Sequence, residues 1–295
     1  MSKTKFSKLW YLVGVLLLAN LAVWTLLSQT RNTDFAKLYF FDVGQGDAIY
    51  LRTAEGNDVL IDGGPGDAVL SKLGRVLPFA DRSIELMLLS HPHADHTSGL
   101  VEILKRYRIK QVLLSDVVYD SATFQTFRNL LEEKKVQVIT PKLGQRIFLD
   151  RSTVLDIYYP VVGKFDPPPT DINDVSIVAR LSFGKSNVLF TGDADRGIEN
   201  LIQNLALPLS AEILKVGHQG SRTSTGPEFL KAVAPDYSII SVGKNSYGHP
   251  HPEVLGILQA QGLTPWRTDE RGDAVFALYA DRVEALSAVA PEVAP

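Results

Sequence analysis

HPHADH, at residues 91–96, holds three of the six histidines of this 295-residue chain. The other three, His218, His249 and His251, each stand beside glycine or proline rather than on a helical stripe. The motif directly follows the apolar run IELMLLS, which predicts a short buried strand. Because sites in α/β folds lie at the carboxyl ends of strands, position and composition both indicate a functional loop.

The H-x-H-x-D-H spacing is typical of metal binding. A loop that closes a strand can point adjacent residues to opposite sides, so His91 and His93 would reach one ion while Asp95 and His96 reach a neighbouring one. Imidazole nitrogen and carboxylate oxygen suit zinc or manganese. The chain contains no cysteine, which excludes a thiolate site and a disulfide-linked partner.

Around this motif the chain has the pattern of one α/β domain. Strand-like runs open it, and from residue 67 helix-like and strand-like segments alternate. We see no repeat and no interior boundary, so we expect residues 32–281 to form a single domain. The small, proline-bearing end of the chain predicts a disordered tail over residues 282–295.

The N-terminal residues 1–31 have a different composition. Residues 9–27 run for nineteen positions without a charge, which at 1.5 Å per residue nearly covers a ~30 Å hydrocarbon layer. Lys3, Lys5 and Lys8 precede this run and favour a cytoplasmic N-terminus. We therefore expect a single-pass anchor in the cell membrane, with the catalytic domain extracytoplasmic. A cleaved signal peptide and a buried core helix are the alternatives, but the run is long for the first and apolar all round for the second.

The charge balance limits the partners. Residues 32–295 hold 26 basic and 33 acidic side chains, a net charge of −7, so this part as a whole would repel a polyanion. Nucleic-acid binding would need a local basic patch. Lys105, Arg106, Arg108 and Lys110 are candidates, although they are equally consistent with the solvated end of a helix.

At HPHADH the sequence resembles the metallo-β-lactamase superfamily, whose signature is the same H-x-H-x-D-H. The resemblance implies an αββα four-layer sandwich that holds two divalent metal ions. It makes Asp62, in VLIDGG, a support for a ligand histidine, although an Asp-Gly turn would also explain it. It makes Asp193, in VLFTGD, a bridge between the ions, and His218, in EILKVGHQGS, a ligand of the second ion.

The implied ligand set has a gap. The first ion would be held by His91, His93 and Asp193, and the second by Asp95, His96, Asp193 and His218. Most superfamily members supply a further histidine, yet none occurs from residue 97 to residue 217. The corresponding slot reads NDVS, which offers Asn173 and Ser176 as substitutes. The first ion would then be weakly held or open to substrate.

This gap narrows the resemblance. FFDVGQGDA, HPHADH, NDVSIV, TGDAD, KVGHQGS and YGHPHPE together are similar to the metallo-hydrolase portion of ComEC-type competence proteins, over about residues 37–280. That family commonly has paired histidines before Gly-Ser, whereas this chain has Gln219 in the second place, which we expect to be peripheral. The family's channel and OB-like domains are not found in this chain, so we do not expect a DNA channel.

The resemblance implies a phosphodiesterase or nuclease in which a metal-activated hydroxide attacks phosphorus. We expect Asp95 and His249 to be catalytic, with His249 binding a phosphate oxygen or protonating the leaving group. The substrate would be a phosphodiester, with nucleic acid as the main candidate. A phosphorylcholine-esterase-like activity, lactone or thioester hydrolysis, and a non-catalytic metal-containing binding module are the alternatives. The sequence leaves open whether Asp42, Gln45, Asp47 and His251 approach the site or shape turns.

Overall fold

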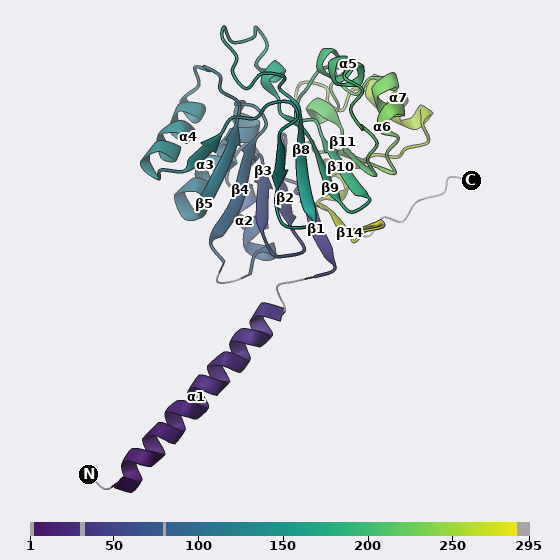
Figure 1. Ribbon diagram of the computed structural model, residues 1–295. Helices are drawn as coiled ribbons and strands as arrows, with labels where there is room; N and C mark the ends of the chain where they lie inside the picture. Colours follow the sequence, from purple (N-terminus) through teal and green to yellow (C-terminus); the bar gives the residue numbers. More distant parts are fainter. Residues whose placement is uncertain (1–2, 30–32, 79–80, 288–295) are drawn as a thin grey trace.

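Two β-sheets packed face to face form the centre of the molecule, and helices cover both outer faces (Figure 1). This computed structural model describes residues 3–29, 33–78 and 81–287. The predicted α/β fold with its αββα order of layers is therefore confirmed.

The first sheet contains eight strands in the order β15-β14-β1-β2-β3-β4-β5-β6. They are β1 (Phe35–Phe40), β2 (Ile49–Arg52), β3 (Asp58–Ile61), β4 (Ser83–Leu89), β5 (Arg108–Leu114), β6 (Gln137–Ile139), β14 (Ala274–Tyr279) and β15 (Val283–Ala285). Strands β3 to β6 are parallel, and parallel neighbours need a crossover between them. The crossovers are α2 (Ala68–Val76), α3 (Ala94–Arg106) and α4 (Ala122–Glu133), whose apolar sides pack on the outer face of this sheet.

The second sheet contains seven strands in the order β13-β12-β11-β10-β9-β8-β7. They are β7 (Arg146–Phe148), β8 (Thr153–Tyr159), β9 (Val178–Phe183), β10 (Ser186–Phe190), β11 (Ile213–Lys215), β12 (Tyr237–Ile240) and β13 (Trp266–Arg267). Its outer face packs against α5 (Arg196–Asn204), α6 (Pro227–Val233) and α7 (Pro252–Ala260). The short helices α8 (Thr268–Arg271), η1 (Ile172–Val175) and η2 (Gly217–Gly220) lie in connecting segments.

The main core lies between the two sheets. Alternate residues of β4 divide between layers: Leu86 and Leu88 belong to the core between the sheets, whereas Met87 and Leu89 pack under the helices. A strand buried on both faces has a nearly continuous apolar sequence, which explains the run that precedes His91. The rigid layers on both sides fix the direction in which the loop after β4 leaves the sheet.

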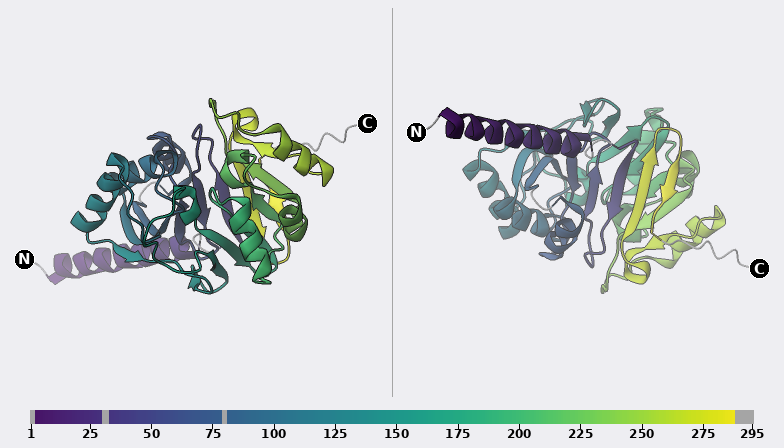
Figure 2. Two further views of the ribbon diagram at one scale, coloured as in Figure 1. Left: turned by 90° about the horizontal axis from the view of Figure 1, so that it is seen from above. Right: turned by 90° about the horizontal axis from the view of Figure 1, so that it is seen from below.

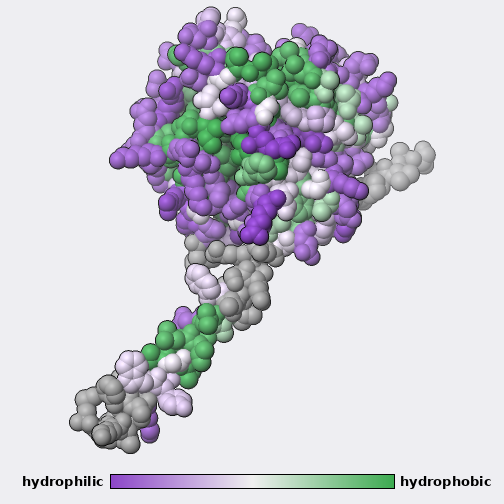
Figure 3. Space-filling model, in the orientation of Figure 1, coloured by the Kyte–Doolittle hydropathy of each residue, from purple (hydrophilic) through white to green (hydrophobic). Residues whose placement is uncertain are grey.

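Helix α1 (Lys3–Gln29) projects away from the two sheets (Figure 1). Apolar side chains on this helix are exposed, Trp10 and Leu17 among them. Figure 3 shows a green, hydrophobic band along the helix. Among the helices that the described residues form, none is long and apolar enough to cross a membrane. The structure thus does not support the anchor predicted over residues 9–27. The side chains at positions 9 and 25–27 lie outside the described residues.

The C-terminal boundary also differs from the prediction. Strand β15 lies inside the segment expected to be disordered from residue 282, and it pairs antiparallel with β14. The backbone N–H of Val275 donates to Ser287 Oγ at 3.0 Å, which ties residues beyond the strand to the sheet. A three-residue strand is too short to leave a periodic signal in a sequence. Residues 288–295 of the expected tail lie outside the described residues.

Candidate metal centre

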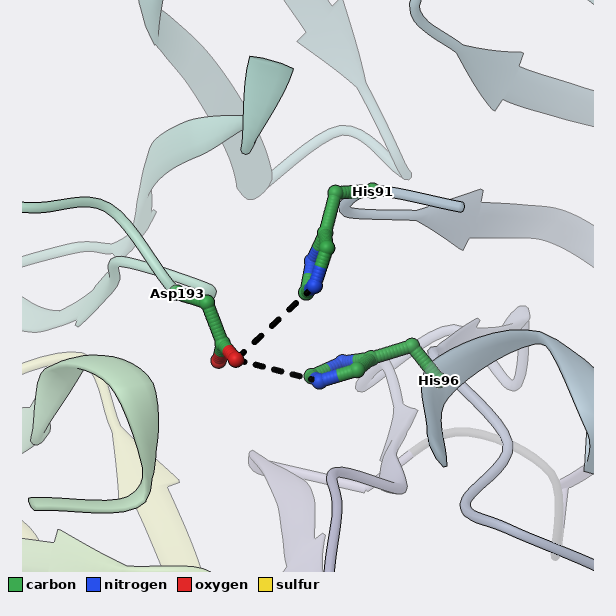
Figure 4. Close-up of side chains that lie close together, drawn as sticks. All are labelled: His91, His96 and Asp193. Carbon is green, nitrogen blue, oxygen red and sulfur yellow. Dashed lines mark ion pairs between the residues drawn. The ribbon is translucent and has the colours of Figure 1, made fainter. Parts of the chain in front are cut away.

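The loops that follow β4 and β10 bring a cluster of histidine and aspartate side chains together between the two sheets. His91 follows β4, His96 lies in the first turn of α3, and Asp193 follows β10 (Figure 4). All three are at most 1% exposed. Asp193 Oδ2 lies 3.5 Å from His96 Nε2 and 3.8 Å from His91 Nε2. These three residues form a group that could hold a metal ion.

The first predicted metal position fits the residues present. His91 Nε2 and His93 Nδ1 lie 3.1 Å apart. Two nitrogens that share one tetrahedral zinc, each at roughly 2.0–2.1 Å, would lie about 3.3 Å apart. Asp193 Oδ1 is buried and has no hydrogen-bond partner within the described ranges, so its lone pairs are available. His218 Nε2 lies 3.6 Å from Asp193 Oδ2, near the same carboxylate.

Burial and charge set the protonation of the cluster. Burial, followed by the neighbouring His96, holds the pKa of His91 well below its usual value, which leaves a neutral imidazole that can bind metal. Burial also lowers the pKa of His96, but Asp193 and Asp62 outweigh it, so the pKa of His96 is well above its usual value. For Asp193, burial raises the pKa, but His96 and His91 outweigh it and keep this pKa well below its usual value.

Asp62 contacts the cluster from below. Its Oδ2 lies 2.8 Å from His96 Nδ1, and it accepts hydrogen bonds from the backbone N–H and the hydroxyl of Ser90, at 2.8 and 2.6 Å. A carboxylate on Nδ1 orients the ring and directs Nε2 toward the centre. Asp62 has a φ of 56°, so it also forms a tight turn before Gly63. Asp62 can therefore both support His96 and form the turn.

The two candidates for the missing third-motif ligand differ in their contacts. Ser176 Oγ accepts a hydrogen bond from the backbone N–H of Asp193 at 3.2 Å, so Ser176 holds the turn that carries this carboxylate. Asn173, in η1, is 8% exposed, and its Oδ1 is buried without a hydrogen-bond partner in the described part of the chain. Of the two, Asn173 keeps the free oxygen that a ligand would need.

The expectation that Gln219 is peripheral is wrong. Its side chain is 3% exposed, and its Nε2 lies 3.0 Å from Asp95 Oδ2 and 3.3 Å from both His96 Nε2 and Asp193 Oδ2. Gln219 and the preceding His218 both have positive φ, 52° and 46°. This left-handed turn directs the amide into the centre, and a sequence pattern does not reveal it.

Sequence reasoning also missed Lys215. Its Nζ lies 2.6 Å from Asp47 Oδ2, and the two side chains are 1% and 2% exposed. Burial raises the pKa of Asp47 to about 6, although Lys215 and His96 lower it. The one signal in the sequence was a lysine inside the apolar strand EILKVG. The pair lies next to the cluster, since Asp47 Oδ2 is 4.0 Å from His96 Nδ1.

The sequence left open whether Asp42, Gln45 and His251 approach the site or shape turns, and the structure distinguishes these roles. Asp42 Oδ1 accepts from the backbone N–H of Gly44 at 3.3 Å and shapes the turn there. Gln45 reaches the centre, where its Nε2 donates to Gln219 Oε1. His251 Nδ1 accepts from the backbone N–H of Glu253 at 3.2 Å, so His251 caps α7.

His249 faces the candidate ligands. Its ring centroid lies 5.3 Å from that of His218, and its Nδ1 is buried without a hydrogen-bond partner among the described residues. Burial, and then the charge of His218, lower the pKa of His249. Asn245 holds the loop in place, since its Nδ2 donates to His249 O at 2.8 Å and its Oδ1 accepts from His249 N at 3.1 Å.

An open cavity of about 340 Å³ lies over the cluster. Its lining combines candidate ligands with aromatic side chains that sequence reasoning did not single out: His93, Ala94, Asp95, Tyr119, Asp193, His218, Gln219, Tyr247 and His249. Tyr119 lies beside His93, with ring centroids 5.9 Å apart. The cavity gives a ligand access to both predicted metal positions and to His249.

The candidate basic patch does not border this cavity. Lys105, Arg106, Arg108 and Lys110 line a separate groove of about 590 Å³ together with Lys134 and Lys135. This groove lies at the amino end of β5, whereas the cluster follows the carboxyl end of the parallel strand β4. The groove and the cluster therefore lie at opposite ends of these parallel strands.

Residues 41–244 match the family model of the metallo-beta-lactamase superfamily, and the chain belongs to this superfamily. Within it, the chain is similar to ComEC-type competence proteins. It is 28% identical over 268 residues to ComE operon protein 3 of Bacillus subtilis (strain 168), and this match covers 85% of this chain and 34% of that protein. It is 29% identical over 281 residues to Competence protein ComA of Neisseria gonorrhoeae, which covers 92% of this chain and 36% of that protein. The chain thus spans about a third of the length of these relatives.

Among solved structures, the chain is similar to CmlA, a diiron beta-hydroxylase from Streptomyces venezuelae. The TM-score is 0.52 with 16% sequence identity, and the match covers 85% of this chain and 54% of that one. At this identity the likeness concerns the fold alone. It agrees with the two-sheet architecture described above.

Proposed function

We infer that this chain is a metal-dependent hydrolase of phosphodiesters and that nucleic acid is its substrate. The observation that carries the proposal is the cavity in which candidate metal ligands face His249. Such a cavity admits a substrate to the ligand cluster, which a closed structural metal site would exclude. The competence-protein relatives support a DNA-related substrate.

The residues around the cavity suggest a division of roles. A bound divalent ion would supply Lewis-acid chemistry, by polarising a phosphate oxygen and acidifying a water molecule. His91, His93 and Asp193 would hold it. Asp95, whose side chain is 32% exposed in the cavity lining, would orient the attacking water and accept its proton.

His249 would act on the substrate itself. Its lowered pKa keeps the imidazole neutral near pH 7, with one ring N–H to donate. A neutral ring is a weak proton source but a good hydrogen-bond donor. This favours contact with a phosphate oxygen over protonation of the leaving group.

A substrate panel tests the proposal with the full chain. Single-stranded DNA, RNA, a choline phosphodiester and a lactone would each be offered with manganese and with zinc. We expect phosphodiester cleavage that depends on added metal and is absent in a folded Asp193→Asn variant. Lactone cleavage alone would replace the proposed substrate class. A folded, metal-loaded chain that cleaves none of the four would favour a non-catalytic binding module.

A location on the outer side of the cell membrane is part of the same proposal. It rests on the charge-free run at residues 9–27 and on the lysines that precede it. The exposed apolar side chains of α1 are consistent with contact to lipid. A reporter that matures only after export, fused after residue 295, should be active. An active cytoplasmic reporter at the same position would contradict the proposed topology.

A further inference from the structure

We propose that the amide of Gln219 takes the place of the second metal ion, so that this chain binds one divalent cation where the sequence predicts two. Three predicted ligand atoms of the second ion surround one amide nitrogen. Gln219 Nε2 lies 3.0 Å from Asp95 Oδ2 and 3.3 Å from both His96 Nε2 and Asp193 Oδ2. The proposal concerns the metal site alone and does not depend on the substrate.

The identity of the amide atom that faces the cluster is fixed by a chain of hydrogen bonds. The backbone N–H of Gly243 can only donate, and it donates to Gln45 Oε1 at 3.1 Å. The other atom of that amide, Gln45 Nε2, therefore donates to Gln219 Oε1. Gln219 must then turn its Nε2 toward the carboxylates. Without such an anchor, the two orientations of an amide are hard to tell apart.

An amide nitrogen in this position competes with a cation. Its lone pair is delocalised into the carbonyl, so it is not a metal ligand, and its two hydrogens carry partial positive charge. They satisfy Asp95 Oδ2 and Asp193 Oδ2, the acceptors that a second ion would need. Gln219 is 3% exposed, and its side chain could not withdraw from the cluster without breaking its bond to Gln45.

The first position is not affected in the same way. His91 Nε2 and His93 Nδ1 face each other at 3.1 Å, and Asp193 Oδ1 has no hydrogen-bond partner among the described residues. One carboxylate oxygen of Asp193 thus accepts from Gln219 while the other remains available to the first ion. Asp95, held by the amide rather than by a cation, is left to act on water.

The test is the number of Mn²⁺ ions that the full chain binds, measured by equilibrium dialysis and by electron paramagnetic resonance. We expect one ion per chain with the spectrum of an isolated Mn²⁺. Two ions about 3.5–4 Å apart would instead give a spin-coupled spectrum. This readout requires no substrate.

Two isosteric variants should admit the second ion. Gln219→Glu replaces the donor nitrogen with an anionic oxygen while it keeps the acceptor for Gln45. Gln45→Glu leaves Gln219 untouched but removes the donor to its Oε1, so the Gln219 amide should turn and present oxygen to the cluster. Both variants should bind two ions and give the coupled spectrum.

A second glutamine pair provides the control. Gln111 Nε2 donates to Gln137 Oε1 at 2.9 Å in an exposed part of the first sheet. Gln111→Glu and Gln137→Glu make the same chemical change there and should leave the count at one. Two ions or none in the unaltered chain, or one ion in both site variants, would overturn the proposal. A chain that binds one ion and cleaves no phosphodiester would contradict only the proposed function.

Discussion

Replacing Lys215 by methionine should destabilise the folded chain by about 3–5 kcal/mol, because it leaves a buried carboxylate without its cation. Asp47 Oδ2 has Lys215 Nζ at 2.6 Å, and both side chains are at most 2% exposed. Asp47 Oδ1 already lacks a hydrogen-bond partner among the described residues. In the Lys215→Met variant, both carboxylate oxygens of Asp47 would therefore be without a strong donor.

Removing both charges should have a much smaller effect. A buried ion pair replaced by apolar groups of similar size is often neutral or stabilising, since both desolvation costs vanish together. We therefore expect Asp47→Leu with Lys215→Met to restore most of the lost stability. The coupling energy from the double-mutant cycle should exceed about 2 kcal/mol.

Urea unfolding and thermal melts in the presence of a chelator would measure these differences, because bound metal would otherwise add to the stability of the folded state. A loss of about 3–5 kcal/mol corresponds to a melting temperature lower by roughly 6–20 °C for a domain of this size. Lys72→Met is a matched control: Lys72 Nζ also lies 2.6 Å from a carboxylate, that of Asp273, but the side chains are 18% and 31% exposed. It should cost about 1 kcal/mol or less. Equal losses in the two lysine variants, or additive effects in the cycle, would refute the reasoning.

Three further changes test other parts of the structure. Asp193→Asn should abolish tight metal binding, which metal analysis would detect, and unchanged metal content would contradict the role of Asp193 in the cluster. Asp62→Asn keeps a residue that tolerates a positive φ but removes the carboxylate from His96 Nδ1. The metal affinity, measured by competition with a chelator, should therefore fall about 10–100-fold. An unchanged affinity would show that Asp62 only forms a turn. Burial raises the pKa of Asp58 to about 6, against the hydrogen bond from Tyr50 and the charge of Arg52. In Arg52→Met this folded-state pKa should rise further. A carboxyl group whose pKa is higher in the folded state than in the unfolded chain stabilises the fold at low pH, and this contribution is lost as the pH rises. The variant should therefore match the unaltered chain most closely near pH 5. Between pH 6 and 8 it should lose up to about 1.4 kcal/mol per pH unit relative to the unaltered chain, and parallel curves of unfolding free energy against pH would contradict this.

The sequence predicted the order of strands and helices well because both periodicities are local. The apolar run before His91 and the alternation from residue 67 depend only on neighbouring residues. The resemblance to a known family then supplied the layer order, which local pattern alone does not determine.

The parts of the centre that the sequence did not predict depend on contacts between distant segments. Gln45 lies between β1 and β2 and Gln219 follows β11, so the two residues are 174 positions apart and meet only in the folded chain. Gln219 also depends on two consecutive residues with positive φ, neither of them glycine. Such a turn is held by its tertiary surroundings and has no reliable sequence signal.

The pairing of β1 with β14 has a consequence for synthesis of the chain. Strand β1 pairs with β14 from Phe35 opposite Tyr279 to Phe40 opposite Ala274, and the right view of Figure 2 shows the purple strand β1 beside the yellow strand β14. During translation β1 keeps an open edge until residues 274–279 have left the ribosome, because its partner on that side, β14, lies far along the chain from it. The sheet that carries the histidine loop is thus completed only after β14 and β15 have been made. A nascent or truncated chain that stops before β14 would expose apolar residues of this sheet, and chaperones or proteases would recognise it before the metal centre is complete.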